Sequence, residues 1–350
     1  MSKSKIVFII GSMARGGAER VISILSDAYA RRGWDVDIIC LLSGRVEYDL
    51  HAHVRVLDFS GKTESRWARF PGWLKNIRQY IKNERPDVVV SFAARINIIT
   101  QLAALGLGTR LIVSERNDPK QDGRSMLIRW ATRLLYPNAA SVVFQTKRAQ
   151  SYFPYLKNAC LIANPISVRA KASDVPTKKI VSVGRLTKQK NQKMLIEAFA
   201  AIASDYPEYK LEIYGEGDLR SALQLQIEQL ALQDRISLPG NVLNIHERIQ
   251  DAALFVLSSN YEGLSNALLE AMMMGLPCVS TNCAGSDEYI RHEQNGVLVP
   301  VGDRQALSEA IARMLQDRSY AQRMGACAHE DSFVFAQDTV IKQWFKAIEL

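Results

Sequence analysis

With 350 residues, of which 47% are hydrophobic and 23% charged, the chain has ordinary globular composition, which excludes a disordered, collagenous or coiled-coil protein and favours two domains over one. No stretch approaches the roughly 20 apolar residues that span a bilayer, and no signal segment is recognisable, so we expect a cytoplasmic protein. The formal net charge of +8 is unevenly divided: residues 1–170 hold 26 basic and 13 acidic residues, a net of +13, whereas the rest has a net charge of −5.

The first half of the chain alternates strand and helix patterns. A buried-strand pattern over residues 5–10 precedes a glycine-rich loop and a helical pattern from Glu19 onward. Further strands are expected at residues 35–42, 88–91, 110–114 and 141–144, with amphipathic helices between them. Elements of these lengths in alternation predict βαβ units around a parallel sheet.

The alternation restarts after residues 165–179, a segment without periodicity that contains two prolines and reads as a linker. We therefore expect an α/β fold of two doubly wound, Rossmann-like lobes that face each other across a cleft. The predicted domains are residues 1–167 and residues 168–330, and residues 331–350 form a C-terminal helix that returns to the first lobe. In such folds ligands bind at the carboxyl ends of the strands.

The first glycine-rich loop contains Gly11, Gly16 and Gly17 and opens the first predicted helix. Phosphate binds readily at a helix N-terminus, and adjacent glycines let a ligand approach the backbone. The spacing matches neither the dinucleotide fingerprint nor a Walker loop. From these residues alone, a tight strand–helix turn without a ligand is an equal alternative.

Three cations follow the first strand of the second lobe. Arg185, Lys188 and Lys190 lie within six residues, and Asn191 is a suitable N-cap, so Lys190 stands at the positive end of a helix. Such a group suits a diphosphate and can stabilise the charge of a departing phosphate by roughly a few kcal/mol. The alternative is a solvated run of charges.

Two glutamates with the spacing E-x7-E follow the predicted strand at 254–258. Glu262 lies in the loop, and Glu270 falls about one turn into the next helix, which Ser265 or Asn266 caps. The amides of residues 263–266 are then free for anionic oxygens, and Glu270 can accept hydrogen bonds from two sugar hydroxyls. An arbitrary E-x7-E is weak, but this position between strand and helix favours a site for a sugar–diphosphate–nucleoside.

These motifs resemble the retaining glycosyltransferases of family 4, which have the GT-B fold. Gly16-Gly17, Arg185 with Lys190, and Glu262 with Glu270 carry the resemblance, which spans almost the whole chain. It implies that Arg185 and Lys190 hold the donor diphosphate and that Glu262 holds the transferred sugar, and these three are the predicted catalytic residues. It also implies that Glu270 binds the ribose and that the backbone of residues 240–242 binds the nucleobase. The predicted donor-binding residues are Gly16, Gly17, Asn241, Val242, Gly263, Leu264, Ser265, Asn266 and Glu270.

One position departs from the family pattern. Where many members have a histidine near the transferred sugar, this chain has Glu115 and Arg116, one of which must fill that space. A permanent cation can contact a phosphate but cannot act as a general base. The resemblance also implies retention of configuration without a metal or other cofactor. Asp35 and Asp37 form the only D-x-D motif, and we interpret it as a hydrated strand edge instead of a metal site.

A basic helix in the first half suggests where the acceptor binds. Pro71 suits a helix start, and Lys75, Arg78, Lys82 and Arg85 are predicted to form a stripe beside an apolar face. Such a helix can lie on an anionic membrane or hold a lipid diphosphate, or it can simply cover the sheet. We expect peripheral association with the inner face of the membrane. The resemblance narrows to bacterial enzymes that extend undecaprenyl-diphosphate-linked glycans with a hexosamine or hexose, with a UDP-sugar as donor.

Other classes of protein fit less well. A sugar-nucleotide 2-epimerase of the same fold needs a base and an acid beside the sugar, where this chain offers Arg116 and Glu262. A non-catalytic nucleotide-sugar-binding partner of an assembly complex predicts a damaged site, yet all four charged site residues are present. Nucleic acid is not expected as a partner, because the aromatic residues near the basic stripe fall on its buried face.

Overall fold

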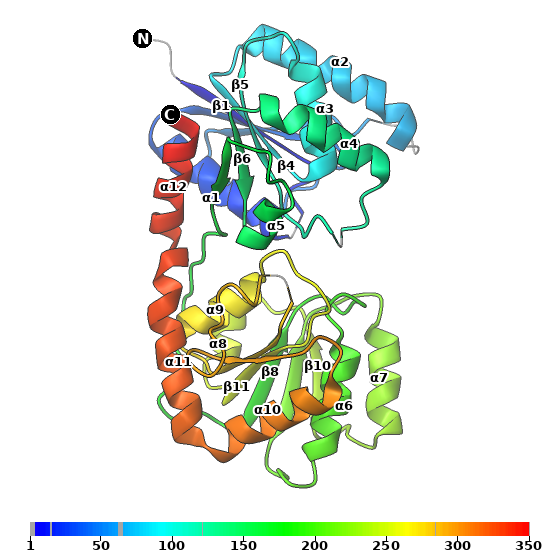
Figure 1. Ribbon diagram of the computed structural model, residues 1–350, viewed down its shortest axis with the longest axis vertical. Helices are drawn as coiled ribbons and strands as arrows, with labels where there is room; N and C mark the ends of the chain where they lie inside the picture. The colour runs from blue at the N-terminus through cyan, green and yellow to red at the C-terminus, as the bar shows by residue number, and fades with distance from the viewer. Residues whose placement is uncertain (1–3, 15, 62–65, 121, 284, 350) are drawn as a thin grey trace. The chain divides into compact units, whose positions relative to one another are not determined.

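The structure is a computed structural model that describes residues 4–14, 16–61, 66–120, 122–283 and 285–349. The chain folds into two compact units, Met1–Pro165 with Asp338–Leu350 and Ile166–Gln337. Each unit has its own sheet of parallel strands flanked by helices (Figure 1). This arrangement confirms the expected α/β class with two doubly wound lobes.

The sheet of the first unit has the strand order β3-β2-β1-β4-β5-β6-β7. Because β1 lies between β2 and β4, the order reverses there, and the loops after β1 and β4 diverge at the carboxyl edge, where such sheets bind ligands. The edge strands β3 and β7 escaped prediction because they are only partly buried. The strands are β1 (Lys5–Ile10), β2 (Asp35–Cys40), β3 (Val54–Asp58), β4 (Val88–Phe92), β5 (Arg110–Ser114), β6 (Ser141–Phe144) and β7 (Ala159–Leu161).

Helices cover both faces of this sheet. The apolar residues of α1 and α12 share one core with β1, β2 and β4, whereas those of α2 and α3 pack against the opposite face. Figure 1 shows α2, α3 and α4 following one another across that second face. The helices are α1 (Gly17–Arg31), α2 (Arg66–Glu84), α3 (Ala94–Ala104), α4 (Met126–Leu135), α5 (Lys147–Ser151) and α12 (Gln337–Glu349).

The C-terminal helix α12 completes the core of the first unit. Trp344, although it lies far along the chain, is fully buried and stacks on Phe92 of β4 with ring centroids 5.9 Å apart. Val340 and Ile348, four residues away on either side, are also fully buried. The last helix of the chain is therefore an integral part of the first unit.

Replacing Trp344 with Ala is expected to lower the free energy of unfolding by about 3–5 kcal/mol, because it removes a large side chain from a packed core. Chemical denaturation followed by circular dichroism measures the loss. Lys342→Ala, a change on the same helix outside the buried stripe, is the matched control and should change stability by less than about 0.5 kcal/mol. Equal effects of the two changes would contradict the role given to α12.

The second unit has a six-stranded sheet with the order β10-β9-β8-β11-β12-β13. In it, α6 packs with α10 and α9 packs with α11. The strands are β8 (Lys179–Val183), β9 (Lys210–Tyr214), β10 (Ile236–Gly240), β11 (Leu254–Leu257), β12 (Cys278–Thr281) and β13 (Val297–Val299). The helices are α6 (Gln192–Ile202), α7 (Arg220–Gln229), α8 (Ile245–Ile249), α9 (Asn266–Met274), α10 (Arg304–Gln316) and α11 (Arg318–Ser332).

The interpretation of the D-x-D motif as a hydrated strand edge is wrong for Asp37. This residue is only 3% exposed, and its two carboxylate oxygens accept hydrogen bonds from Arg55 at 2.9 and 2.7 Å. Burial raises the pKa of Asp37, but the hydrogen bonds from Arg55 and Tyr80 and the charge of Lys5 lower it by more. The carboxylate therefore serves a structural ion-pair network in the first unit.

Among the residues that the structure describes, no helix combines the length and the apolar character that crossing a membrane requires.

Candidate active site

Lys190 and Glu262 form an ion pair at the carboxyl edge of the second unit's sheet. The Lys190 Nζ lies 2.6 Å from Glu262 Oε1, which also accepts a hydrogen bond from Ser259 Oγ at 2.6 Å. The two side chains are only 15% and 7% exposed. Because β8 and β11 are neighbouring strands, the loops that follow them meet at this edge and bring together residues 72 positions apart.

Hydrogen bonds hold these two loops in place. The Ser258 hydroxyl donates to the Lys190 carbonyl oxygen at 2.9 Å, and the Gln189 amide donates to the Tyr261 carbonyl oxygen at 3.0 Å. Asn191 occupies the N-cap position of α6, but its side chain donates to Asn260 and caps nothing, contrary to expectation. The geometry of the Lys190–Glu262 pair is thus set by the loops around it.

Two glycines let the backbone pass close to Lys190. A Cβ on Gly184 would lie 3.2 Å from the Lys190 Cε atom. Gly215, at the end of the neighbouring strand, has φ +138°, and a Cβ there would lie 2.1 Å from the Gly184 carbonyl oxygen. Side chains are therefore excluded where the ends of β8 and β9 converge.

Arg185 is exposed, and among the described residues its guanidinium has no hydrogen bond or ion pair. Its carbonyl oxygen accepts a hydrogen bond from the Gln192 side chain at 2.8 Å, which fixes the backbone of the loop. The structure thus places Arg185 on the same loop as Lys190 without joining its charged group to the Lys190–Glu262 pair. Lys188 is also exposed.

The N-terminus of α9 lies next to Glu262. Ser265 is the N-cap, and its hydroxyl accepts from the Leu268 amide at 3.5 Å, which decides between the two predicted caps. Gly285 packs against this turn, since a Cβ there would lie 2.2 Å from the Gly263 carbonyl oxygen. Leu264 is buried, and Gly263 and Asn266 are partly exposed. The turn therefore combines backbone amides, a helix N-terminus and a carboxylate.

The second glutamate of the motif contacts a histidine that the sequence reasoning missed. Glu270 is 8% exposed, and its Oε2 lies 3.2 Å from His246 Nε2. The other ring nitrogen accepts a hydrogen bond from the Arg169 amide at 3.3 Å. No spacing signal marks His246, because it comes from the short helix α8. This helix follows Asn241, which is exposed, and Val242, which is partly buried.

In the first unit, the predicted glycine pair stands at the start of α1. Gly16 is the N-cap, and Gly17 is the first helical residue. The Tyr48 hydroxyl accepts from the Gly16 amide at 3.2 Å and donates to its carbonyl oxygen at 2.8 Å. A Cβ on Gly16 would lie 2.2 Å from Glu19 Oε2, so this carboxylate occupies the positive end of the helix.

Glu115 has a structural role, contrary to its prediction as a residue near the sugar. It is 2% exposed, and its Oε2 lies 2.9 Å from Arg124 Nη2. The other oxygen accepts a hydrogen bond from the Tyr136 hydroxyl. Both oxygens are therefore engaged within the core of the first unit, because a buried carboxylate requires such partners.

Arg116 is buried but incompletely paired. Its guanidinium lies 4.6 Å from the ring centroid of Phe92 and 5.6 Å from that of Trp344, and Nη1 donates to Asn164 Oδ1 at 2.9 Å. Nε and Nη2 are buried and find no acceptor among the residues that the structure describes. Burial lowers the pKa of Arg116 to about 9, so the side chain stays charged at neutral pH.

The basic stripe predicted on α2 is shorter than expected. The helix begins at Arg66, so Pro71 lies inside it, and it ends at Glu84, which leaves Arg85 outside it with φ +43°. Arg78 donates to the carbonyl oxygens of Ala103 and Leu105 at the end of α3. Lys75 and Lys82 are exposed. The four predicted cations therefore do not form one stripe on α2, because Arg78 caps the end of α3 and Arg85 lies beyond the end of α2.

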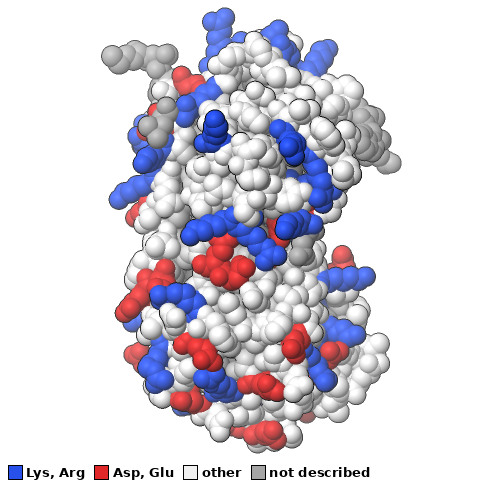
Figure 2. Space-filling view, in the orientation of Figure 1, with Lys and Arg blue, Asp and Glu red and all other residues white. Residues whose placement is uncertain are grey.

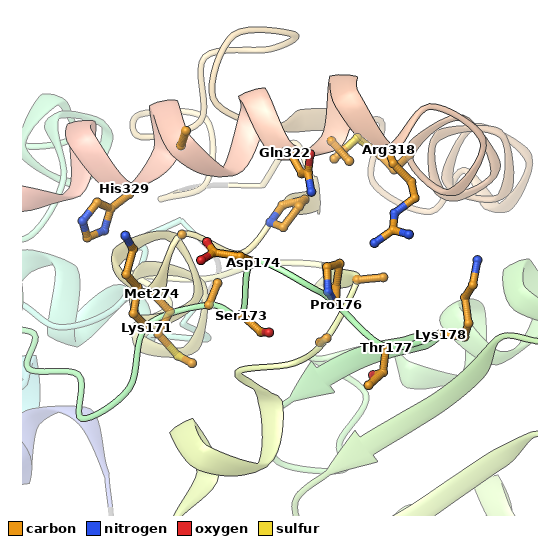
Figure 3. A pocket seen from close by; sticks show the side chains of 18 of the residues that line it. Lys171, Ser173, Asp174, Pro176, Thr177, Lys178, Met274, Arg318, Gln322 and His329 are labelled. Carbon is orange, nitrogen blue, oxygen red and sulfur yellow. The ribbon is translucent and has the colours of Figure 1, made fainter.

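A pocket of about 420 Å³ lies on the opposite edge of the second unit's sheet. Its wall includes Lys178 and Pro277, which precede β8 and β12, and Figure 3 shows Arg318 and Gln322 pointing from α11 toward the segment that contains Pro176. None of the predicted site residues lines it. The amino ends of the strands form this pocket, so it is separate from the Lys190–Glu262 pair.

Solved structures identify the class of fold. Sucrose-phosphate synthase from Thermosynechococcus elongatus is 18% identical, with a TM-score of 0.86 and 98% of each chain covered. Alr3699/HepE from Anabaena, solved in complex with UDP and glucose, is 19% identical, with a TM-score of 0.84 and 98% of each chain covered. The protein therefore has the GT-B fold.

Family models and relatives define the activity. Residues 16–156 match the glycosyl transferase 4-like domain, and residues 165–331 match glycosyl transferases group 1. The chain belongs to this family of glycosyltransferases. A Campylobacter jejuni α-1,4-N-acetyl-D-galactosaminyltransferase, named for the acceptor GalNAc-α-(1→4)-GalNAc-α-(1→3)-diNAcBac-PP-undecaprenol, is 28% identical, with 98% of each chain covered. An N-acetylgalactosamine-N,N′-diacetylbacillosaminyl-diphospho-undecaprenol 4-α-N-acetylgalactosaminyltransferase of the same organism is 28% identical over 89% of this chain and 90% of its own.

Proposed function

We propose that this glycosyltransferase moves a sugar from a UDP-sugar to a lipid-diphosphate-linked glycan with retention of configuration. The observation that carries the proposal is the ion pair between the partly buried Lys190 and the buried Glu262, beside the N-terminus of α9. A lysine ammonium suits a departing diphosphate, and a carboxylate with nearby backbone amides suits a sugar and its phosphate. The acceptor class follows the names of the two Campylobacter relatives, and a UDP-HexNAc is the preferred donor.

The proposed reaction needs only charges that the chain supplies. The bond between C1 and the β-phosphate oxygen breaks, and a bond between C1 and the acceptor hydroxyl oxygen forms on the same face. The hydroxyl proton passes to the departing phosphate oxygen. Lys190 and Arg185 stabilise the charge that grows on UDP, so no metal or other cofactor is required. We expect this lipid-diphosphate-linked glycan to be extended on the cytoplasmic side of the membrane and to serve bacterial surface polysaccharide or glycoprotein glycan synthesis.

The test is incubation of the purified protein with UDP-GalNAc, UDP-GlcNAc and UDP-hexoses and a short-chain prenyl-diphosphate glycan, with excess EDTA in parallel. Nuclear magnetic resonance of the product should show an α-linkage, which retains the configuration of the α-configured donor. The rate of transfer should be unchanged by EDTA. A β-linked product would overturn retention, and a loss of activity with EDTA that Mg²⁺ restores would overturn metal independence.

Glu270 is proposed to bind the ribose, and its removal should weaken nucleotide binding. Glu270→Ala is expected to raise the Kd for UDP about 10- to 100-fold, because hydrogen bonds to a charged group contribute about 1.5–3 kcal/mol. The kcat at saturating donor should change much less, since the ribose takes no part in the bond that breaks. Isothermal titration calorimetry measures the Kd, and Glu228→Ala on the exposed face of α7 is the control.

Arg116 is proposed to face the acceptor or the transferred sugar with its two unpaired nitrogen atoms, Nε and Nη2. Arg116→Met keeps the length of the side chain and removes a buried charge, so the free energy of unfolding should not fall by more than about 1 kcal/mol. Transfer should nevertheless fall by about tenfold or more, because a charge-assisted hydrogen bond is lost. Thermal denaturation and initial rates measure the two effects. A stability loss with an unchanged rate would assign Arg116 a structural role.

The exposed lysines of α2 are proposed to contact the lipid diphosphate or the anionic membrane surface. Lys75 and Lys82 remain available for such contacts, and each base near a charged bilayer contributes about 1 kcal/mol. Arg78 and Arg85 are not expected to contribute equally, since Arg78 caps α3. This part of the proposal gives the protein a peripheral position at the membrane.

A further inference from the structure

Helix α4 has its apolar residues on the outside. It begins after Ser125, whose hydroxyl accepts from the Ile128 amide, and it runs from Met126 to Leu135. Thr132 is the one residue of this helix that is buried. Four large apolar side chains, which we call the α4 patch, are 60–72% exposed: Met126, Leu127, Trp130 and Leu134.

The α4 patch is a continuous stripe. At about 100° per residue, its four side chains fall within an arc of about 100° on the helix surface. A surface helix of a soluble protein normally points such a stripe at the core and exposes its charges. In the same unit α2 follows this rule: its Trp73 and Ile77 are buried in the core, and its Lys75 is exposed. The inverted arrangement on α4 therefore calls for an apolar partner outside the unit.

Cations border the patch. Arg129 donates to the Tyr152 hydroxyl at 2.5 Å, and the Arg133 guanidinium lies 5.3 Å from the ring centroid of Tyr155. These contacts hold both arginines beside the apolar stripe. A helix with tryptophan and leucine on one side and arginine next to them matches the interfacial layer of a bilayer, where indole and guanidinium groups meet anionic head groups.

The surroundings of α4 favour the same partner. Helix α3 packs against both α2 and α4, so the exposed lysines of α2 and the α4 patch belong to one helical layer. Over the part of the first unit where Figure 1 draws α3 and α4, Figure 2 shows uncharged surface with Lys and Arg side chains across it and around it. Residues 1–170 have a net charge of +13. An anionic membrane surface has the charge that complements such a cationic layer.

We propose that the α4 patch inserts into the interfacial layer of anionic membranes and supplies the apolar part of membrane binding. The cations of α2 and α4 supply the electrostatic part. This inference rests on the proposed function only in so far as a lipid-linked acceptor places the enzyme at a membrane. Transfer to a water-soluble acceptor does not depend on the patch.

The test is co-sedimentation of the full chain with vesicles of phosphatidylcholine and phosphatidylglycerol in a ratio of about 7:3. The triple variant Leu127→Ser, Trp130→Ser, Leu134→Ser should lower the partition coefficient by about 30-fold or more, since three apolar side chains lose their contact with lipid. The matched control Val175→Ser, Leu225→Ser, Leu230→Ser removes exposed apolar side chains from the second unit and should leave binding unchanged. Lys75→Gln with Lys82→Gln should reduce the salt-sensitive part of binding.

Insertion also has a direct signal. Brominated lipids should quench a component of tryptophan fluorescence that is absent from Trp130→Phe. Wild-type binding by the serine triple variant, or no difference in quenching, would overturn the proposal. A monomer–dimer equilibrium in sedimentation velocity that the triple variant abolishes without changing vesicle binding would assign the patch to a second copy of the chain. The rate of transfer to a water-soluble short-chain acceptor should be the same in the triple variant as in wild type. If the wild-type protein transfers no sugar to this acceptor, the proposed function is refuted instead.

Discussion

Replacing Lys190 with Gln is expected to lower kcat by about 100- to 1000-fold, which is the loss typical of removing one preorganised group that stabilises charge in a transition state. Glutamine can still donate a hydrogen bond to Glu262, so the variant removes the charge while preserving a contact to that carboxylate. The charge matters because the departing diphosphate gains negative charge as the bond to C1 breaks. The partly buried position of Lys190, with 15% of its side chain exposed, limits screening by water.

The measurement is the single-turnover rate at saturating UDP-sugar, with the thermal midpoint as a check on folding. Lys188→Gln is the matched control, because Lys188 is exposed on the same loop, and we expect less than about a threefold change. Equal rates for the two variants would show that Lys190 does not act on the leaving group. A lower affinity for UDP with an unchanged kcat would assign it to ground-state binding.

Glu262→Gln is expected to lower kcat/KM for transfer by about 100-fold while leaving the Kd for UDP within about threefold. The carboxylate is proposed to hold the transferred sugar, and a loosely held sugar is badly placed for attack by the acceptor. UDP lacks that sugar, so its affinity reports the rest of the site. Glu309→Gln, on the exposed side of α10, serves as the control. A parallel loss of UDP affinity would contradict a role confined to the sugar.

A double-mutant cycle connects these two predictions. The Lys190 Nζ and Glu262 Oε1 atoms are 2.6 Å apart in an ion pair, so the effects of the two changes on stability should not add. We expect the double variant Lys190→Gln, Glu262→Gln to be more stable than the sum of the single changes implies, because each single change leaves one buried group without its charged partner. Additive effects would show that the pair does not persist in solution.

Much of the fold was predictable because hydrophobic periodicity reflects burial. The strands at the centre of each sheet are buried on both faces and show as continuous apolar runs, as in residues 6–10 and 254–257. Edge strands such as β3 are only partly buried and carry no such signal. The end of α2 was misplaced because helical spacing continues through Arg85, whereas the backbone leaves the helix there.

Charged residues were harder to assign, because a charge pattern does not say which partner a side chain finds. Glu115 was interpreted as sugar-proximal and Asp37 as hydrated, but each is buried and paired with an arginine, Arg124 and Arg55 respectively. Arg78 was interpreted as part of a lipid-facing stripe, but carbonyl oxygens at the end of α3 bind it. His246 was not predicted at all, because its contact with Glu270 joins two separate helices.

The sequence by itself determined the fold class and the motifs of the second unit, because buried strands and glycine-dependent turns are written into local residue order. Only the tertiary structure decided which charges meet. In the folded chain Lys190 pairs with Glu262, Glu115 is buried in the core of the first unit, and the apolar side of α4 is exposed. The physical reason is that pairing and exposure depend on neighbours brought together by folding, and hydrophobic spacing predicts that an apolar face exists without saying whether protein or another partner covers it.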